Sequence, residues 1–411
     1  MSRATPSLVA AAALMLGACT PGPDTPQGQG AAGPMELVLW HAYRGDERAA
    51  LDETVDRFQT THPGVHVRAL AVPYDAFVDK VSMSVPKGNG PDVFIFGHDR
   101  LGDWASRGLV EPLGFLADER LVGRFERETL DALVYGGELY GLPLDFKCLA
   151  LYYNPTLVPT PPATTDDLRS AGKAARGKDA RVWGIAWELD SLYFHAPWLH
   201  GFGGSVYAPP PAEPDTLTLD SAEAAASVQF VRDLRERDGL IPPEVTSALV
   251  TTLFRSDQMA FVVSGPWFRG ELSGFEHWAV APLPTVSETN RPAAPFLGVE
   301  GLFMSRRSAH KAEAFELMQA LTDDDAARTR FRKAGQLVAN RAVYADPDTQ
   351  KDTFAQAFRA QLAHTVALSN RPHMRRVWTP AKDALSAGIV HGEPAGAVWK
   401  KAVEEIARSA E

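Results

Sequence analysis

The sequence predicts an α/β protein of two domains. Short apolar runs with the composition of β-strands alternate along the chain with segments whose apolar residues recur at helical spacing. This alternation is typical of a mostly parallel sheet with helices on both faces. At 411 residues the chain is too long for one compact core and fits two domains. Its apolar fraction of 45% and charged fraction of 22% are ordinary for a soluble globular protein.

The individual elements follow from this alternation. Strands are expected at 36–40, 65–70, 93–96, 182–186, 259–263 and 302–304. Helices are expected over about 46–60, 74–85, 101–107, 164–175, 221–238, 308–321 and 395–407. Gly108 is the expected stop of the third helix, and Thr165 the expected N-cap of the fourth. The sequence shows no internal repeat.

The first nineteen residues have the pattern of a secretory signal. Arg3 is their only charged residue, and the apolar stretch Leu8–Leu16 is too short to span a bilayer. The ending Leu16-Gly17-Ala18-Cys19 resembles a bacterial lipobox, in which the cysteine is lipidated and becomes the mature N-terminus. The alternative is an ordinary signal whose cysteine is incidental. Residues 20–34 are rich in Pro, Gly and Gln and are expected to form a flexible tether.

Charge and cysteine content narrow the class of protein. The 41 basic and 51 acidic residues give a net charge of −10, which argues against a nucleic-acid binder that must neutralise phosphates. Cys19 and Cys148 are the two cysteines, so no disulfide is expected if Cys19 carries a lipid. Cys148 lies in an apolar stretch and is expected to be a buried small hydrophobe. We therefore expect a soluble protein that is anchored outside the cytoplasm through Cys19, and nothing in the sequence indicates an oligomer.

The motifs of common enzymes and metal sites are absent from the sequence. It contains no Gly-x-Ser-x-Gly, no Walker loop, no His-Glu-x-x-His and no Cys/His cluster at metal-ligand spacing. A glycosidase needs two carboxylates across one cleft, which the sequence alone neither indicates nor excludes. We therefore expect no catalytic residue, no metal and no cofactor.

The segment Gly90–Leu113 carries the first indication of function. The apolar run 93–96 leads directly into Gly97-His98-Asp99-Arg100, so Asp99 and Arg100 lie at the carboxyl end of a buried strand. Ligands of α/β folds bind at that end of the strands. A carboxylate beside a guanidinium offers acceptors and donors together, which suits a neutral polyhydroxylated molecule such as a sugar. The alternative is a helix cap combined with a surface ion pair.

Tryptophans at the ends of predicted elements are the second indication. Trp40, Trp267 and Trp378 each lie where an apolar run meets Gly, Pro or charged residues. The apolar face of a pyranose ring stacks on flat aromatic rings, whereas its hydroxyls require hydrogen bonds. The alternative for any single tryptophan is core packing, and we keep it for the remaining candidates. These are Trp104, Trp183, Trp278 and Trp399.

Five ordered motifs over about residues 35–408 resemble a known family, the extracytoplasmic solute-binding proteins of carbohydrate ABC transporters, specifically their maltose/maltodextrin-binding group. The motifs are Gly90-Pro91-Asp92 through His98-Asp99-Arg100, Gly141-Leu142-Pro143 to Tyr153-Asn154, Gly265-Pro266-Trp267, Pro295-Phe296-Leu297-Gly298-Val299, and Pro372-His373-Met374 with Trp378. The resemblance implies a type II periplasmic-binding-protein fold of two α/β lobes that close over a ligand in the cleft between them. It implies an N-terminal lobe of 35–146 and 302–347 and a C-terminal lobe of 147–301 and 348–411.

The same resemblance implies roles for particular residues. Asp99 and Arg100 match the polar pair that binds sugar hydroxyls, and Phe96 matches an aromatic position that lines the site. Trp40 opens the first strand as in the family. The aromatic residues that match those stacking on sugar rings from the C-terminal lobe are Tyr193, Trp267 and Trp378.

The chain also departs from the family pattern. Lys147 stands where the maltose binders have a ligand-binding glutamate, and this reversal exchanges an acceptor for a donor. The segment 43–46 lacks the adjacent Asp-Lys pair of the family, and a glutamate expected before Tyr193 is missing. Arg44, Asp46 and Glu300 are candidate replacements. The sugar is therefore not restricted to maltose.

These observations together predict a lipid-anchored protein that binds a carbohydrate, hands it to the permease of an ABC transporter and catalyses nothing. One alternative is a sensor subunit that delivers the closed complex to a membrane signalling receptor. The other is an enzyme built on the same two-lobed scaffold.

Overall fold

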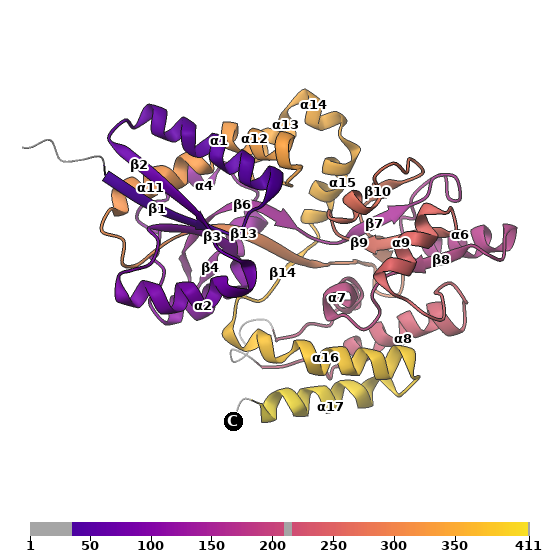
Figure 1. The fold of residues 1–411 in the computed structure, drawn as a ribbon. Helices are drawn as coiled ribbons and strands as arrows, with labels where there is room; N and C mark the ends of the chain where they lie inside the picture. The colour runs from indigo at the N-terminus through magenta and orange to yellow at the C-terminus, as the bar shows by residue number, and fades with distance from the viewer. Residues whose placement is uncertain (1–34, 209–215, 410–411) are drawn as a thin grey trace, which may run out of the picture.

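The computed structural model describes residues 35–208 and 216–409, which form two lobes that lie side by side (Figure 1). The predicted signal, the lipidation site Cys19 and the predicted tether 20–34 lie outside the described residues. Each lobe is built around its own sheet. We call the lobe with the six-stranded sheet the first lobe and the one with the four-stranded sheet the second lobe.

The first lobe has the strand order β14-β13-β3-β1-β2, with β6 also paired to β13. These strands are β1 (Met35–His41), β2 (Val65–Ala71), β3 (Val93–Gly97), β6 (Gly141–Lys147), β13 (Phe296–Met304) and β14 (Val366–Ala367). β1 runs parallel to β2 and β3, whereas β13 runs antiparallel to β3 and β6. The helices of this lobe are α1 (Gly45–Thr61), α2 (Tyr74–Ser84), α3 (Leu101–Ser106), α4 (Glu119–Val122), α5 (Arg127–Asp131), α11 (Lys311–Leu321) and α12 (Asp324–Ala334).

Helical spacing of apolar residues explains how α1 covers this sheet. Leu51, Val55 and Phe58 recur at intervals of three and four, and all three are buried against Leu37 and Leu39 of β1 in one apolar cluster. Charged residues on another face of α1 pair with the region of α12, Arg57 with Asp323 and Glu53 with Lys333. The apolar stripe and these ion pairs together hold α1, and with it the N-terminus of the helix, in a fixed place beside β1.

The second lobe has the strand order β10-β7-β9-β8. These strands are β7 (Ala150–Tyr153), β8 (Trp183–Ala186), β9 (Met259–Ser264) and β10 (Ala279–Ala281). The helices are α6 (Thr165–Lys178), α7 (Leu192–Gly201), α8 (Ala222–Glu236), α9 (Ser247–Arg255), α10 (Phe268–Glu271), α15 (Thr353–Leu362), α16 (Trp378–Leu385) and α17 (Ala395–Arg408). α15 packs against β10, and α16 and α17 lie next to each other beside α8 (Figure 1).

Short elements complete the chain. They are the two-stranded sheets β4 (Val134–Tyr135) with β5 (Glu138–Leu139) and β11 (Thr285–Val286) with β12 (Arg291–Pro292), the helices α13 (Arg341–Ala345) and α14 (Pro347–Lys351), and the short helices η1 (Val85–Lys87), η2 (His98–Arg100), η3 (Pro372–Arg376) and η4 (Ser386–Val390). Among the described residues, no helix combines the length and apolar character needed to cross a membrane.

The two-lobed α/β architecture agrees with the prediction, but neither sheet is as parallel as expected. In the second lobe β8 and β9 are parallel, whereas β7 runs antiparallel to both β9 and β10. The reason is the path of the chain, because only Cys148 and Leu149 separate β6 from β7. The direction of β7 is therefore set by the direction of β6 in the first sheet. The residue boundaries of the lobes given above stay a prediction.

Most predicted elements are confirmed, and the differences are local. Thr164, and not Thr165, caps α6, because its hydroxyl accepts from the Asp167 amide while the Asp167 side chain accepts from Thr164. Thr165 is buried instead, and its hydroxyl donates a hydrogen bond to the Ser287 hydroxyl. The predicted strand 302–304 is only the end of the nine-residue strand β13. Gly108 has a left-handed φ of 64°, as its role as a stop requires.

A glycine in α3 provides a test of the packing of this helix against the segment that follows β14. The Gly102 amide donates to the Asn370 carbonyl at 3.0 Å, and a Cβ at Gly102 would overlap that carbonyl oxygen. We expect Gly102→Ala to lower the free energy of unfolding by about 1–3 kcal/mol, measured by urea denaturation. Gly177→Ala in α6, where a Cβ meets nothing within 4 Å, is the matched control and should be neutral or stabilising. Equal stability of the two variants would contradict this packing.

Candidate functional site

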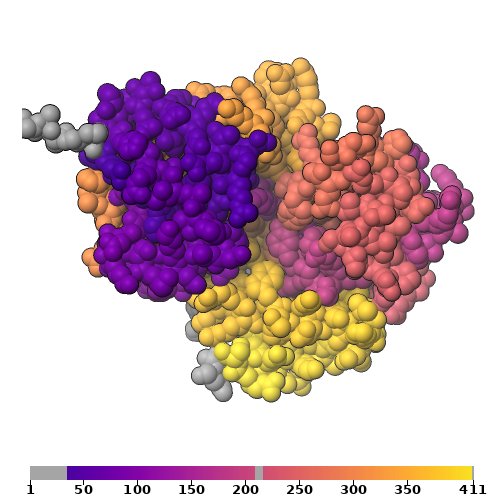
Figure 2. Space-filling model, viewed as in Figure 1, coloured from indigo at the N-terminus to yellow at the C-terminus, as the bar shows by residue number. Residues whose placement is uncertain are grey.

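A cleft separates the two lobes and is visible as a hollow between them (Figure 2). It holds a cavity of about 270 Å³ that is lined from both sides. The first lobe contributes Glu47, Asp145, Phe146 and Lys147, the second lobe contributes Pro266 and Trp267, and the end of α12 with the segment after it contributes residues 334–337. The cleft is therefore formed by residues that are far apart in the sequence.

Asp99 and Arg100 lie in η2, directly after β3, as the sequence predicts. Arg100 Nε is 3.1 Å from Asp99 Oδ2, and each side chain is about 30% exposed. The alternative interpretation of these residues was a helix cap combined with a surface ion pair. The ion pair exists, but Asp99 caps no helix. Both side chains retain donors and acceptors for a ligand.

His98 fixes this turn to the neighbouring strand. Its Nδ1 accepts from the Val299 amide at 3.0 Å, so its Nε2 carries the proton and donates to the Leu368 carbonyl at 2.8 Å. Burial lowers the pKa of His98, which keeps the ring in this neutral form. The position of Asp99 and Arg100 is consequently set by β13 as well as by β3.

Two predicted aromatic residues of the first lobe are nearly fully buried. Phe96 is 3% exposed and Trp40 is 4% exposed, and both pack in one apolar cluster of the core, so their contact with a ligand stays a prediction. Phe96 stacks between Phe77 at 4.7 Å and Tyr74 at 4.9 Å. Tyr74 is 59% exposed and its pKa is raised by partial burial and by Asp99. The exposed ring beside the Asp99 pair is therefore Tyr74, which sequence reasoning missed although it begins a helix after a strand end.

Lys147 and Glu300 face each other across the pair β6–β13. Lys147 Nζ is 3.5 Å from Glu300 Oε1, and the Tyr43 hydroxyl donates to Glu300 Oε2 at 2.8 Å. The register pairs Glu300 with Asp145, and Gln336 Nε2 donates to Asp145 Oδ2 at 2.9 Å. Lys147 and Glu300, which the sequence suggested separately, thus form one unit at the floor of the cleft.

Electrostatics define the charge of this unit. Burial, followed by the charge of Glu300, raises the pKa of Asp145 well above its usual range, which favours the protonated form of this side chain. The charge of Glu300 is also the largest cause of the raised pKa of Lys147, which outweighs the opposing effect of burial. Glu47 has a raised pKa because of its own burial. The site therefore offers a fixed ammonium group next to carboxyl oxygens.

Three partners in this unit, Tyr43, Asp145 and Gln336, were not predicted from the sequence. Arg44 and Asp46, which were proposed as replacements for the family's Asp-Lys pair, are exposed at the start of α1. No hydrogen bond or ion pair joins either side chain to the described residues of the cleft. The structure places Tyr43 there instead, since its ring is 6% exposed and its hydroxyl points to Glu300.

The predicted aromatic residues of the second lobe gather around Phe296. Tyr193 and Trp378 each lie 6.3 Å from the Phe296 ring, and Tyr193 also lies 6.3 Å from Trp267. Trp267 is 44% exposed at the start of α10. Gly265 is needed for this arrangement because a Cβ there would overlap the indole of Trp267. The cleft is thus lined by an exposed indole on one side and by charged groups on the other.

This combination suits binding better than catalysis. Exposed aromatic faces and paired donors and acceptors match a ring with an apolar face and polar hydroxyls. The described residues contain no group of three or more His, Cys, Asp or Glu side chains that could hold a metal ion. Cys148 is fully buried, and burial raises the pKa of its thiol, which disfavours a nucleophilic thiolate.

The raised pKa of Asp145 has a measurable consequence. A carboxyl group whose pKa is raised on folding stabilises the fold fully below its unfolded pKa, and this stability is lost as the pH rises through the folded pKa. We expect stability to fall above the ordinary aspartate range, by up to about 1.4 kcal/mol per pH unit for this group. Asp145→Asn should flatten that slope in urea denaturation between pH 4 and 8, while Glu47 continues to contribute with the same sign. An unchanged slope in Asp145→Asn would contradict the assignment.

Comparisons with known proteins agree with this geometry. A family model described as bacterial extracellular solute-binding protein matches residues 42–328. The maltotriose-binding protein of Pyrococcus abyssi (strain GE5 / Orsay) is 24% identical over 384 residues, which cover 92% of this chain and 83% of that protein. The galactooligosaccharide-binding protein of Bacillus subtilis (strain 168) is 25% identical over 413 residues, which cover 98% of this chain and 95% of that protein.

The fold is matched by solved structures. A cyclo/maltodextrin-binding protein complexed with maltotetraose superposes with a TM-score of 0.85 at 27% identity, covering 93% of this chain and 99% of that chain. The resemblance to maltose- and maltodextrin-binding relatives and the periplasmic-binding-protein fold are therefore confirmed. This chain belongs to the bacterial extracellular solute-binding proteins, a family that binds solutes and is not enzymatic.

Proposed function

We propose that this protein binds a neutral saccharide of two or more units between its lobes and delivers it to the permease of an ABC transporter. The observation that carries the proposal is the cleft itself, where Trp267 from the second lobe faces the same cavity as Lys147 from the first. The ion pair of Asp99 and Arg100 and the exposed ring of Tyr74 add donors, acceptors and a stacking surface. Relatives named for maltotriose and galactooligosaccharide binding support the ligand class.

The mechanism follows from the distribution of these contacts over two lobes. A saccharide that touches only one lobe gains part of the available interaction energy, whereas a saccharide in the closed cleft gains contacts from both. Binding therefore shifts the protein toward the closed form by the difference between the two affinities. The permease then distinguishes loaded from empty protein by this closure. A lipid on Cys19 would hold the protein outside the cytoplasm and next to its membrane partner.

Selectivity in this proposal depends on the Lys147–Glu300 pair. An ammonium group donates hydrogen bonds and accepts none, so it favours sugar oxygens whose lone pairs point into the cavity. A glutamate at position 147 would instead select hydroxyl donors. The relatives include binders of both maltose-type and galactose-type saccharides. The stereochemistry of the sugar is set by residues around this pair and not by the fold.

Ligand binding is tested most simply by thermal stability. A saccharide present at 100 times its dissociation constant stabilises the protein by about 2.7 kcal/mol, because it binds the folded state alone. We expect at least one neutral di- or oligosaccharide to raise the melting temperature of the purified protein in a calorimetric screen. Amino acids and short peptides serve as controls and should leave it unchanged. A screen in which only the controls raise the melting temperature would rule out the saccharide assignment.

The role of Lys147 is tested by a charge exchange. We expect Lys147→Glu to change the ratio of dissociation constants for two bound saccharides by about tenfold or more, since about 1.4 kcal/mol of hydrogen bonding is redistributed. Isothermal titration calorimetry provides the constants. Lys400→Glu, which alters an exposed lysine on α17, is the matched control. An unchanged ratio in Lys147→Glu would mean that this position does not set selectivity.

A further inference from the structure

A buried histidine connects the turn that contains Asp99 and Arg100 to two other parts of the chain. His98 is 1% exposed and lies in η2, immediately before Asp99. Its ring accepts from the Val299 amide on one side and donates to the Leu368 carbonyl on the other. Val299 belongs to β13, whereas Leu368 directly follows β14. One side chain thus joins three segments that are far apart in the sequence.

The hydrogen bonds between β13 and β14 show what this ring replaces. The Leu368 amide donates to the Leu297 carbonyl of β13 at 2.9 Å. In a regular parallel ladder the next bond would run directly from the Val299 amide to the Leu368 carbonyl. Both of these groups bond to His98 instead, at 3.0 and 2.8 Å. The imidazole is therefore inserted into the ladder and keeps the two segments apart by the width of its ring.

On the β14 side, the bond to His98 is one of several that hold the segment after this strand to the first lobe. The Gly102 amide donates to the Asn370 carbonyl at 3.0 Å, and Asn370 Nδ2 donates to the Val134 carbonyl at 2.9 Å. η3 follows this segment and leads into α16, which begins at Trp378. The place at which the chain leaves the first lobe toward α16 is therefore fixed partly by His98.

On the β13 side, the bond from Val299 lies between two residues that belong to the surroundings of the cleft. Glu300 is the next residue of the strand and carries the carboxylate that pairs with the cleft-floor ammonium group. Phe296, three residues before Val299, is the ring around which the aromatic residues of the second lobe gather. His98 consequently holds the Asp99 turn at a fixed place relative to both groups.

We propose that His98 is a positioning residue of the saccharide site, which couples the turn of Asp99 and Arg100 to β13 and to the segment after β14. This inference rests on the proposed function. A saccharide held by Asp99 and Arg100 then acts through the imidazole on two segments that it does not touch. The ring does this in its neutral form, because only a neutral imidazole accepts at one nitrogen while it donates at the other. Without the ring, the ligand itself has to order the turn, which lowers its affinity.

Variants of His98 separate its two hydrogen bonds. Asparagine places an acceptor near the position of Nδ1 and glutamine places a donor near that of Nε2. His98→Asn and His98→Gln can therefore each keep one bond, whereas His98→Leu keeps neither. In isothermal titration calorimetry with the best-bound saccharide, we expect an affinity about tenfold lower for His98→Leu and about threefold lower for the other two. Each titration is made well below the melting temperature of the variant.

His195→Leu is the matched control for the loss of a buried histidine. His195 is fully buried in α7, its Nε2 hydrogen-bonds to the Ser227 hydroxyl at 2.8 Å, and it does not line the cleft cavity. We expect this change to lower the melting temperature and to keep the affinity within about twofold of the wild type. The same behaviour in the His98 variants would mean a structural role alone and would overturn the inference.

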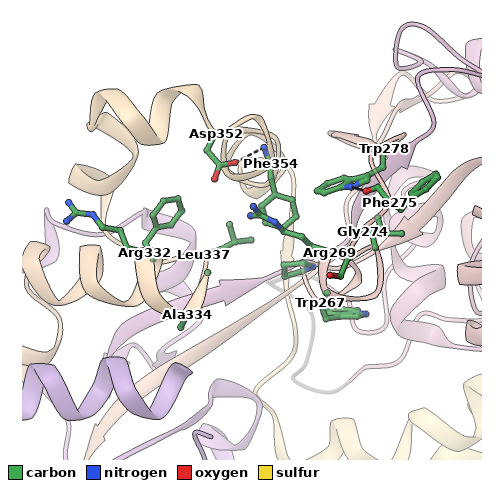
Figure 3. Close-up of a pocket in the computed structure, with 16 residues that line it drawn as sticks. Trp267, Arg269, Gly274, Phe275, Trp278, Arg332, Ala334, Leu337, Asp352 and Phe354 are labelled. Atoms are coloured by element: carbon green, nitrogen blue, oxygen red, sulfur yellow. Dashed lines mark hydrogen bonds between the residues drawn. The ribbon is translucent and has the colours of Figure 1, made fainter. Parts of the chain in front are cut away.

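A second measurement uses the wild-type protein, so it does not depend on whether the variants fold. Hydrogen exchange is followed in peptides that contain Val299 and residues 368–370, with and without saturating saccharide. Val299 and Leu368 line neither the cleft cavity nor the larger cavity of about 850 Å³ between α10, α12 and α15 (Figure 3). We expect the saccharide to slow exchange in both peptides about threefold more than in α11, the reference helix of the same lobe.

The possible results separate this inference from the proposed function. Failure of every saccharide to bind the wild-type protein would overturn both. If a saccharide binds, exchange in the two peptides that merely follows α11 would overturn the coupling and leave the saccharide assignment intact. An equal loss of affinity in all three His98 variants would also overturn it, because ring packing and not the two hydrogen bonds would then be responsible. Partial rescue by asparagine and glutamine, together with the selective slowing of exchange, would support it.

Discussion

The antiparallel pairing of β6 with β13 is the constraint on which the site depends. Its register places Asp145 beside Glu300 and brings Lys147 near the Glu300 carboxylate. Two acidic side chains therefore lie next to each other. Two carboxylates cannot both ionise there at low cost, so burial and the charge of Glu300 raise the pKa of Asp145, and the charge of Glu300 also raises the pKa of Lys147. Because β7 follows β6 after two residues, the same strand also fixes the second lobe.

Each exposed aromatic ring of the cleft is supported by others behind it. Tyr74 stacks on buried Phe96, and the Trp267 ring packs against the rings of Tyr193 and Phe194. Such backing holds a ring face in one orientation before a ligand arrives, which reduces the entropy lost on binding. The charged groups are held in place by hydrogen bonds. The Tyr43 hydroxyl donates to Glu300, and His98 ties the turn that contains Asp99 to Val299 of β13. The site is thus organised in advance, and in the proposed mechanism lobe closure is the remaining change.

The sequence predicted what depends on local pattern and missed what depends on packing. The positions of Asp99, Arg100 and Trp267 were predicted because each follows a strand that ends in a recognisable turn. The near-complete burial of Phe96 and Trp40 was not predicted, since which ring at a strand end faces the core is decided by neighbours distant in the chain, for Phe96 the rings of Phe77 and Tyr74. Tyr43 and Asp145 carried no local signal at all. Their function arises from contact with Glu300, which enters the sheet only through β13.

The most direct test of the central claim is a crystal structure of the protein with the saccharide that raises its melting temperature most. The account predicts a sugar ring against the indole of Trp267, with hydroxyl groups in hydrogen-bond distance of Lys147 or Glu300 on the opposite lobe and the two lobes closed over it. A saccharide bound outside the cleft, or bound there without contact to either Trp267 or the Lys147–Glu300 pair, would contradict it.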